Sequence, residues 1–354
     1  MRIEQLTFTR FLAAVSIVVF HYGGKSFLFN NDYVGFIFTK ADVCVSYFFI
    51  LSGFVMMIAY GNKSVIVAKD YFIKRFVRIY PVYFLALFMM FILQMRTEDL
   101  DFSGLFLNVL MIQSWVPGKA LSVNSPGWSL SVEFLFYAIF SLMFNKFFKI
   151  ASLKKVFFFI VLFWIISQVS FQLLFVFYRD SELDIMKDVL KYNPLMHVNE
   201  FLIGNLAGLF FIQHLQEKKG NYDFVILILA VLVILALKFS LGLNFHNGLL
   251  AVFFVPLIIL FSLNNGYITQ VFQKKPFVFL GKISFGIYIL QHPVYSLISS
   301  YTVNKYFQIN DVTIVFFIRL VVLLVVSSVT YIYIEKPIQN KIKVKRKIVV
   351  LSKI

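Results

Sequence analysis

Charged side chains are scarce in this sequence: Asp, Glu, Lys and Arg make up 14% of its 354 residues, while 60% are hydrophobic. A soluble domain carries about 25% charged residues, so this composition cannot cover a water-exposed surface. Apolar runs of about 17–25 residues, each long enough to cross a bilayer as a helix, recur along the whole chain. The scarcity of charge therefore excludes a soluble protein and predicts an all-α, polytopic membrane protein.

Residues of metal-binding or nucleophilic motifs are also few. Cys44 is the single cysteine, which excludes an internal disulfide, and we interpret it as a packing residue. The sequence has no run of metal ligands, no glycine-rich nucleotide loop and no nucleophile elbow. These absences disfavour a metalloenzyme, an ATPase and a hydrolase, and we expect neither a metal nor a bound cofactor.

Acidic residues are outnumbered: 17 Asp and Glu face 33 Lys and Arg, for a net charge of +16. In a soluble protein this excess would suggest nucleic-acid binding, but here the cations lie in loops and in the C-terminal tail. We therefore expect no nucleic-acid partner. We divide the chain into a membrane domain, residues 1–335, and a basic cytoplasmic tail, residues 336–354, which faces anionic lipid. The cations of this tail are Lys336, Lys341, Lys343, Lys345, Arg346, Lys347 and Lys353.

Ten segments are predicted to span the membrane, and a shorter one, Leu105–Trp115, to be interfacial or re-entrant. The ten spans are approximately residues 6–23, 41–60, 76–95, 128–145, 155–177, 195–215, 223–240, 247–263, 280–302 and 312–334. Loops rich in Lys and Arg alternate with cation-poor or mixed loops, and the positive-inside rule assigns the former to the cytoplasm. They are loops 61–75, 146–155, 216–222 and 264–279. Both termini are then cytoplasmic, and we expect the first span to remain uncleaved because it lacks a signal-peptidase site.

Arg10 and His21 stand at opposite ends of the first span. Eleven positions separate them, which in an α-helix places them on one face, about 16 Å apart along the axis. Taken singly, Arg10 fits a snorkelling anchor and His21 an interfacial polar residue. Their shared face favours a joint role, with a cation near the cytoplasm and a titratable base near the outer surface.

Arg75 and Arg78 lie at the start of the third span with the i,i+3 spacing of one helical face. Guanidinium groups bind phosphate bidentately, so these residues and Arg10 are candidates for holding a phosphorylated cytoplasmic ligand. The alternative is a basic flank that only determines topology.

Polar residues inside other spans are further candidates. Glu133 lies about two turns inside the fourth span, at a depth similar to that of His21, so a His–Glu pair is possible. His292 is near the middle of the ninth span, and Ser52-Gly53 in the second is typical of close helix packing. Three ionisable residues are expected to form ion pairs between helices: Asp42, Glu200 and Arg319.

Several segments resemble, in order and over nearly the whole chain, the membrane acyltransferase-3 family. They are Arg10 and His21 with ten residues between them, YFFILSGF (47–54), RFVRIYP (75–81), PGWSLSVEFLFY (126–137), NEFLIGNLAG (199–208), SFGIYILQHP (284–293) and YIEKP (333–337). That family has about ten spanning helices and transfers acyl groups, often acetyl, to glycans outside the cytoplasm. Its pattern often has an arginine where this chain has His197.

The resemblance implies acetyl-CoA or another acyl-CoA as co-substrate and a hydroxyl of a lipid-linked or cell-surface glycan as acceptor, at a bacterial inner membrane. It places Arg10, His21, Arg75, Arg78 and Glu133 at the active centre. Many relatives carry a fused extracytoplasmic esterase-like domain, whereas here we expect the membrane domain or a partner to handle the acceptor.

On this hypothesis the three arginines hold the phosphates of CoA, and His21 is the general base, oriented by Glu133 or another acid. Groups near Ser52 or Trp128 stabilise the oxyanion, and His292 is a further substrate-binding candidate. Two rivals stay open. One is a secondary transporter, which a repeat between the two halves would favour, and the other is a non-catalytic component of a glycan export system.

Overall fold

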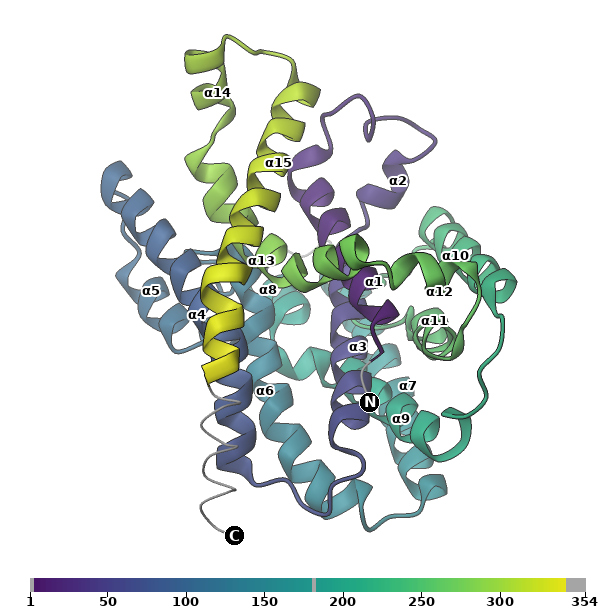
Figure 1. Cartoon of the computed structure of the whole chain (residues 1–354). Coiled ribbons are helices and arrows are strands. Elements are labelled where there is room, and N and C mark those ends of the chain that lie inside the picture. Colours follow the sequence, from purple (N-terminus) through teal and green to yellow (C-terminus); the bar gives the residue numbers. More distant parts are fainter. Residues whose placement is uncertain (1–2, 180–182, 342–354) are drawn as a thin grey trace.

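The computed structural model describes residues 3–179 and 183–341, and this part of the chain is built from helices (Figure 1). They are α1 (Gln5–Val18), α2 (Gly35–Phe38), α3 (Val43–Tyr60), α4 (Ala68–Thr97), α5 (Phe102–Val109), α6 (Trp128–Met143), α7 (Leu153–Arg179), α8 (Asp184–Tyr192), α9 (Val198–Phe210), α10 (Asp223–Lys238), α11 (Ala251–Leu263), α12 (Tyr267–Phe272), α13 (Lys275–Leu297), α14 (Ser300–Phe307) and α15 (Val312–Thr330). The prediction of an all-α fold is confirmed for the described residues.

Eight helical segments in the described part are long and apolar enough to cross a membrane, against the ten predicted. They are Gln5–Gly23, Val43–Tyr60, Ala68–Thr97, Ser125–Phe148, Leu153–Arg179, Pro194–Leu215, Lys275–Leu297 and Val312–Lys341. The other two predicted spans form α10, with 16 residues, and α11, with 13. Helices of this length rise about 20–24 Å, less than the roughly 30 Å of a hydrocarbon core, so the count of ten is not confirmed.

Three predicted boundaries differ from the structure. The third span begins at Ala68 rather than residue 76, so Arg75 and Arg78 lie within α4 and not at its start. The ninth, predicted as 280–302, runs from Lys275 to Leu297, with a proline in its first turn, where a missing N–H costs nothing. The last helical segment continues to Lys341, past the proposed boundary between 335 and 336. The tail cations from Lys343 onward lie outside the described residues.

The segment Leu105–Trp115 does not form a spanning helix, in agreement with its prediction. α5 is short, and the carboxylate of Asp101 caps it by accepting the N–H of Gly104. That hydrogen bond and the ammonium of Lys119, 2.9 Å away, lower the pKa of Asp101 to about 2. The Tyr83 hydroxyl of α4 donates to the carbonyl of Asn108 over 3.0 Å and holds the segment on the bundle.

Contacts between loops agree with the predicted alternation of cation-rich and cation-poor groups. In the cation-rich group, the amide of Asn145 exchanges two hydrogen bonds of 2.9 Å with the backbone of Ile66. In the other group, the N–H of Gly118 donates to Asp188 over 2.8 Å, joining the loops before α6 and around α8. The contacts agree with two opposite faces, while the assignment of one face to the cytoplasm stays a prediction.

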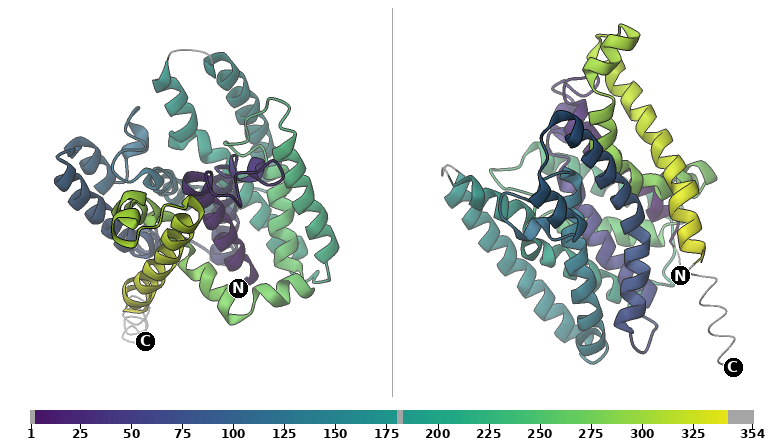
Figure 2. Two further views of the ribbon diagram at one scale, coloured as in Figure 1. Left: turned by 90° about the horizontal axis from the view of Figure 1, so that it is seen from above. Right: turned by 90° about the vertical axis from the view of Figure 1, so that its left-hand side faces the viewer.

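The helices α3 and α9 pack closely along their length and lie side by side in Figure 1. A Cβ on Gly204 would collide with the carbonyl of Ile50, and one on Gly53 with the carbonyl of Phe201. The predicted close packing at Ser52-Gly53 is therefore confirmed. Cys44 is a half-buried free thiol that packs against the hydrophobic core, as predicted. By contrast, α15 lies at an edge of the molecule in both views of Figure 2.

Candidate functional site

A cavity of about 410 Å³ opens between α1, α3, α4, α6, α13 and the helical turn that follows α15. Five of the eight residues proposed from the sequence line it, namely Arg10, Ser52, Arg75, Arg78 and Glu133, whereas His21, Trp128 and His292 do not. Two further charged residues complete the wall, Lys282 and Glu335. The cavity thus combines four cations with two carboxylates, an excess of positive charge suited to an anionic ligand.

The arginines of the cavity are held by aromatic rings or left without partners. The guanidinium of Arg75 lies 5.4, 5.6 and 5.9 Å from the ring centroids of Tyr60, Tyr71 and Tyr137. This aromatic cage stabilises a cation without neutralising it. Among the described residues, Arg10 and Arg78 make neither a hydrogen bond nor an ion pair with a protein group. Their donors are available to a ligand.

Glu133 faces the cavity and not His21. Its Oε2 accepts a hydrogen bond of 2.7 Å from the Tyr137 hydroxyl, one turn further along α6. The described part of the chain contains no hydrogen bond or ion pair between Glu133 and His21, so the suggested His–Glu pair is not observed. The predicted pair rested only on the similar membrane depth of the two residues. Depth does not determine toward which neighbouring helix a side chain points.

Sequence reasoning missed two charged residues of the wall. Glu335 lies in YIEKP, one of the segments that carried the resemblance, and Lys282 lies two residues before another, SFGIYILQHP, but each also fits the common pattern of an ionisable residue near a helix end. The signal that could have identified them is their position inside apolar helices. The packing of the helices brings Lys282 and Glu335 to the same cavity as Arg10.

His21 and His292 form a second group beyond the cavity. His21 is exposed in the π-helical turn Val19–Gly23 that ends the first span, a distortion often found at functional sites. It lies within electrostatic range of His292. Tyr288 lines the cavity, and His292 follows it by four residues, about 6 Å along α13. The histidines therefore stand about one helical turn past the end of the cavity.

The hydrogen bonding of His292 determines its neutral tautomer. Its Nδ1 accepts the backbone N–H of Ser125 over 3.2 Å. A nitrogen that accepts cannot also carry a proton, so neutral His292 has its N–H at Nε2. This second nitrogen is a donor that no described residue satisfies.

Trp128 is a packing residue in this structure. It is 6% exposed, and its ring lies 5.9 Å from Phe49, 5.1 Å from Tyr192, 5.2 Å from His197 and 5.7 Å from His246. The indole supports the polar network described next and does not line the cavity.

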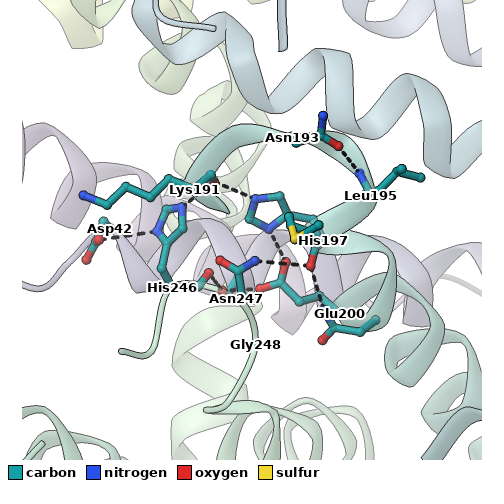
Figure 3. A network of polar contacts seen from close by, with 12 residues as sticks. Asp42, Lys191, Asn193, Leu195, His197, Glu200, His246, Asn247 and Gly248 are labelled. Atoms are coloured by element: carbon teal, nitrogen blue, oxygen red, sulfur yellow. Dashed lines mark hydrogen bonds and ion pairs between the residues drawn. The ribbon is translucent and has the colours of Figure 1, made fainter. Parts of the chain in front are cut away.

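A buried polar network joins α3, α8, α9 and the loop before α11 (Figure 3). The Nε2 atoms of His197 and His246 both donate to the carbonyl of Lys191, over 2.8 and 2.9 Å. The Nδ1 of His197 lies 2.7 Å from Glu200 Oε2, and the other oxygen of Glu200 bonds to the Ser46 hydroxyl. Both nitrogens of the His197 ring are therefore engaged by protein groups. The residue that replaces the family's frequent arginine is therefore part of a buried pair with Glu200.

Three residues were expected to form ion pairs between helices; two of them have an ionisable partner, but neither of these pairs joins two spans. Glu200 pairs with His197 of its own segment, and Asp42 lies 3.4 Å from Nδ1 of His246 in a loop. Burial raises the pKa of Asp42, but the nearby His246, the N–H of Val43 and the charge of Lys191 together outweigh it and hold that pKa below its usual value. The prediction is wrong for Arg319. Its guanidinium lies 4.2 Å from the ring centroid of Tyr295 and donates to that residue's carbonyl, so an aromatic face replaces the carboxylate.

Comparison with known proteins identifies relatives along most of the chain. The chain is 31% identical over 156 residues to "Acyltransferase MdmB" of Streptomyces mycarofaciens, and the match covers 41% of this chain and 40% of that protein. It is 20% identical over 369 aligned positions to a Staphylococcus aureus (strain COL) protein named "Putative O-acetyltransferase", covering 94% of this chain and 56% of that protein. The matches thus span about half the length of these relatives.

No solved structure matches the chain. The family model described as an acyltransferase domain matches residues 3–332, which include α1 to α15 and every cation of the cavity. The chain belongs to the acyltransferase-3 family.

Proposed function

We propose that this chain is a membrane-embedded O-acyltransferase of the bacterial inner membrane. It moves an acetyl group from cytoplasmic acetyl-CoA to a hydroxyl of a lipid-linked or cell-surface glycan. Family membership and the names of the relatives support acyl transfer. The observation that carries the proposal is the cavity, which Arg10 and Arg78 line without a hydrogen-bond or ion-pair partner among the described residues.

The donor binds with its phosphates at the arginines. Guanidinium groups match phosphate oxygens bidentately, and Lys282 adds a fourth positive charge. The pantetheine arm then extends along the cavity past Ser52 toward Tyr288. Along α1, the step from Arg10 to His21 is about 16 Å, a span that an extended pantetheine covers.

The acyl group is transferred at the two histidines. His21 removes the proton of the acceptor hydroxyl while its oxygen bonds to the thioester carbon, and the C–S bond then breaks. The departing thiolate takes the proton from the His21 imidazolium, so the base is regenerated. His292, whose Nε2–H is bonded to no residue that the structure describes, donates to the oxyanion of the tetrahedral intermediate.

The remaining candidates act in support. Glu133 and Ser52 lie in the cavity wall, where they contact the donor and not the acceptor. Trp128 packs behind the site against His197 and His246. It contributes to binding by holding the outer ends of α6 and α9 together.

A labelling experiment on membrane vesicles tests the proposal. Vesicles that contain the full chain are incubated with acetyl-CoA labelled in the acetyl group, and lipid-linked glycan is then extracted and counted. Label should enter the glycan fraction only when the chain is present. Movement of a solute across the vesicle membrane without acetyl transfer would support the transporter instead. If neither acetyl transfer nor solute movement is detected, the non-catalytic export component is the hypothesis that stays.

A further inference from the structure

Glu335 presents an unsatisfied carboxylate oxygen to the cavity. It ends the π-helical turn Tyr331–Glu335 after α15, and it is 5% exposed. Its Oε1 has no hydrogen-bond partner in the described part of the chain. Arg10 and Arg78 lie within electrostatic range of it, but within residues 3–179 and 183–341 it forms no ion pair.

The second carboxylate of the cavity is arranged differently. Glu133 is anchored by the Tyr137 hydroxyl at 2.7 Å, so its charge is already engaged by the protein. A buried carboxylate oxygen left without a donor costs free energy. If Glu335 served only as a counter-ion, an arginine side chain within reach would be bonded to it. The structure instead keeps both the cations and this acceptor open toward the same space.

The charges define what a ligand must carry. The cations Arg10, Arg75, Arg78 and Lys282 favour a ligand with phosphate groups. Glu335 repels a phosphate and accepts hydrogen bonds from N–H or O–H groups. A ligand that satisfies both therefore bears phosphates and neutral hydrogen-bond donors on one molecule. A CoA thioester does so, with its phosphates, its ribose hydroxyl, its adenine amino group and its two amide N–H groups.

We propose that Glu335 is a specificity residue of the donor site, where it accepts a hydrogen bond from an N–H or O–H group of bound acyl-CoA. The inference rests on the proposed function. Glu335 favours a nucleotide–pantetheine ligand over a simple polyphosphate of similar charge. Gln339 lies one turn further on and lines the same cavity, so the hydrogen-bonding surface extends toward the end of the helix.

A comparison of two ligands isolates this hydrogen bond. The purified full chain is titrated with CoA and with pyrophosphate, which has the phosphate charge but no N–H donor. Removing the carboxylate relieves repulsion of both ligands but loses the hydrogen bond of CoA alone. In Glu335→Ala the ratio of the Kd for CoA to the Kd for pyrophosphate should rise on the order of ten-fold. Glu335→Gln, which keeps the side-chain volume, should shift the ratio in the same direction by less.

Control variants separate the possible outcomes. Glu217→Ala removes an exposed carboxylate outside the cavity and should leave the ratio unchanged. If the ratio is also unchanged in both Glu335 variants while Arg78→Ala weakens both ligands, the role of Glu335 is overturned and the donor site stands. If the unmodified chain binds neither ligand, the proposed function fails with it. If the Glu335→Ala protein does not fold, the Glu335→Gln protein is measured in its place. An unchanged ratio of the Kd for CoA to the Kd for pyrophosphate in that variant overturns the inference equally.

Discussion

At the scale of single residues, the proposed mechanism assigns donor binding and acyl transfer to opposite ends of the first span. Arg10 lines the cavity, whereas His21 lies outside it in a π-helical turn. A helix is stiff enough to keep a fixed distance between the two. On the proposed mechanism, α1 therefore sets the spacing between the phosphate end and the reacting end of one donor.

Substitutions at these two residues should have different effects. His21→Ala should reduce acetyl transfer by about 10²–10⁴-fold with donor affinity nearly unchanged, because a general base acts on the rate and not on donor binding. Arg10→Ala should weaken acetyl-CoA binding by roughly 10- to 100-fold, and Arg10→Lys should restore part of the loss, since an ammonium keeps the charge without the bidentate geometry. Transfer rates and Kd values, normalised to the amount of protein in the membrane, measure both effects.

The alternative is that both residues only anchor the helix. Either substitution would then lower the amount of protein and leave activity per molecule intact. A well-expressed His21→Ala protein that transfers acetyl at the unmodified rate would remove His21 from the mechanism.

At the scale of elements, the contact between α3 and α9 holds the site together. α3 carries Ser52 into the cavity, and α9 carries Glu200 into the buried network of Figure 3. The two backbones approach closely because glycines face carbonyl groups at Gly53 and Gly204. In membranes such small residues allow dense packing where no hydrophobic force drives helices together.

Adding one methyl group at this contact should be destabilising. In Gly204→Ala the new Cβ meets the rigid carbonyl of Ile50, so the helices must separate, at a cost of about 1–3 kcal/mol. Gly24→Ala is the matched control, because nothing lies within 4 Å of the added atom. Thermal unfolding of the purified proteins should show a lower Tm for the first variant alone. An equal Tm for both would mean that the α3–α9 approach adapts without cost.

At the scale of the whole molecule, α10 and α11 decide the topology. Each is shorter than a usual span, but α10 begins beside Asn264 of the cation-rich loops and ends where Lys40 donates to the carbonyl of Leu237. Helix tilt and local thinning of the bilayer accommodate short spans. We therefore expect both helices to cross, for ten spans with cytoplasmic termini.

A reporter inserted between these helices distinguishes eight spans from ten. A fusion at the C-terminus cannot do so, because either even number leaves that end in the cytoplasm. A periplasmic alkaline phosphatase fused after Gly242, in the loop between α10 and α11, should be active if both helices cross. The same enzyme fused after Lys63 in the first cation-rich loop should be inactive. Phosphatase activity after Lys63 would mean that the assigned orientation is reversed. Inactivity at both positions would mean that α10 and α11 do not cross and that the chain has eight spans.

Composition and hydropathy were sufficient to predict the helical membrane fold, because backbone groups in lipid must bond within their own segment. Helical spacing was sufficient to place Arg75 and Arg78 on one face, and both line the cavity. These are local properties: a repeat of 3.6 residues and a run of apolar side chains are readable without knowing what packs against them.

The tertiary structure alone decided which faces meet. Depth along a helix suggested that Glu133 pairs with His21. The rotation of α6 instead turns Glu133 toward the cavity, where its carboxylate accepts a hydrogen bond from Tyr137. Lys282 and Glu335 join Arg10 from the far end of the sequence, and His197 pairs with Glu200 inside a network that reaches the loop before α11. A side chain's partner depends on how a helix is rotated against its neighbours. That rotation is set by packing between distant segments, which no local pattern records.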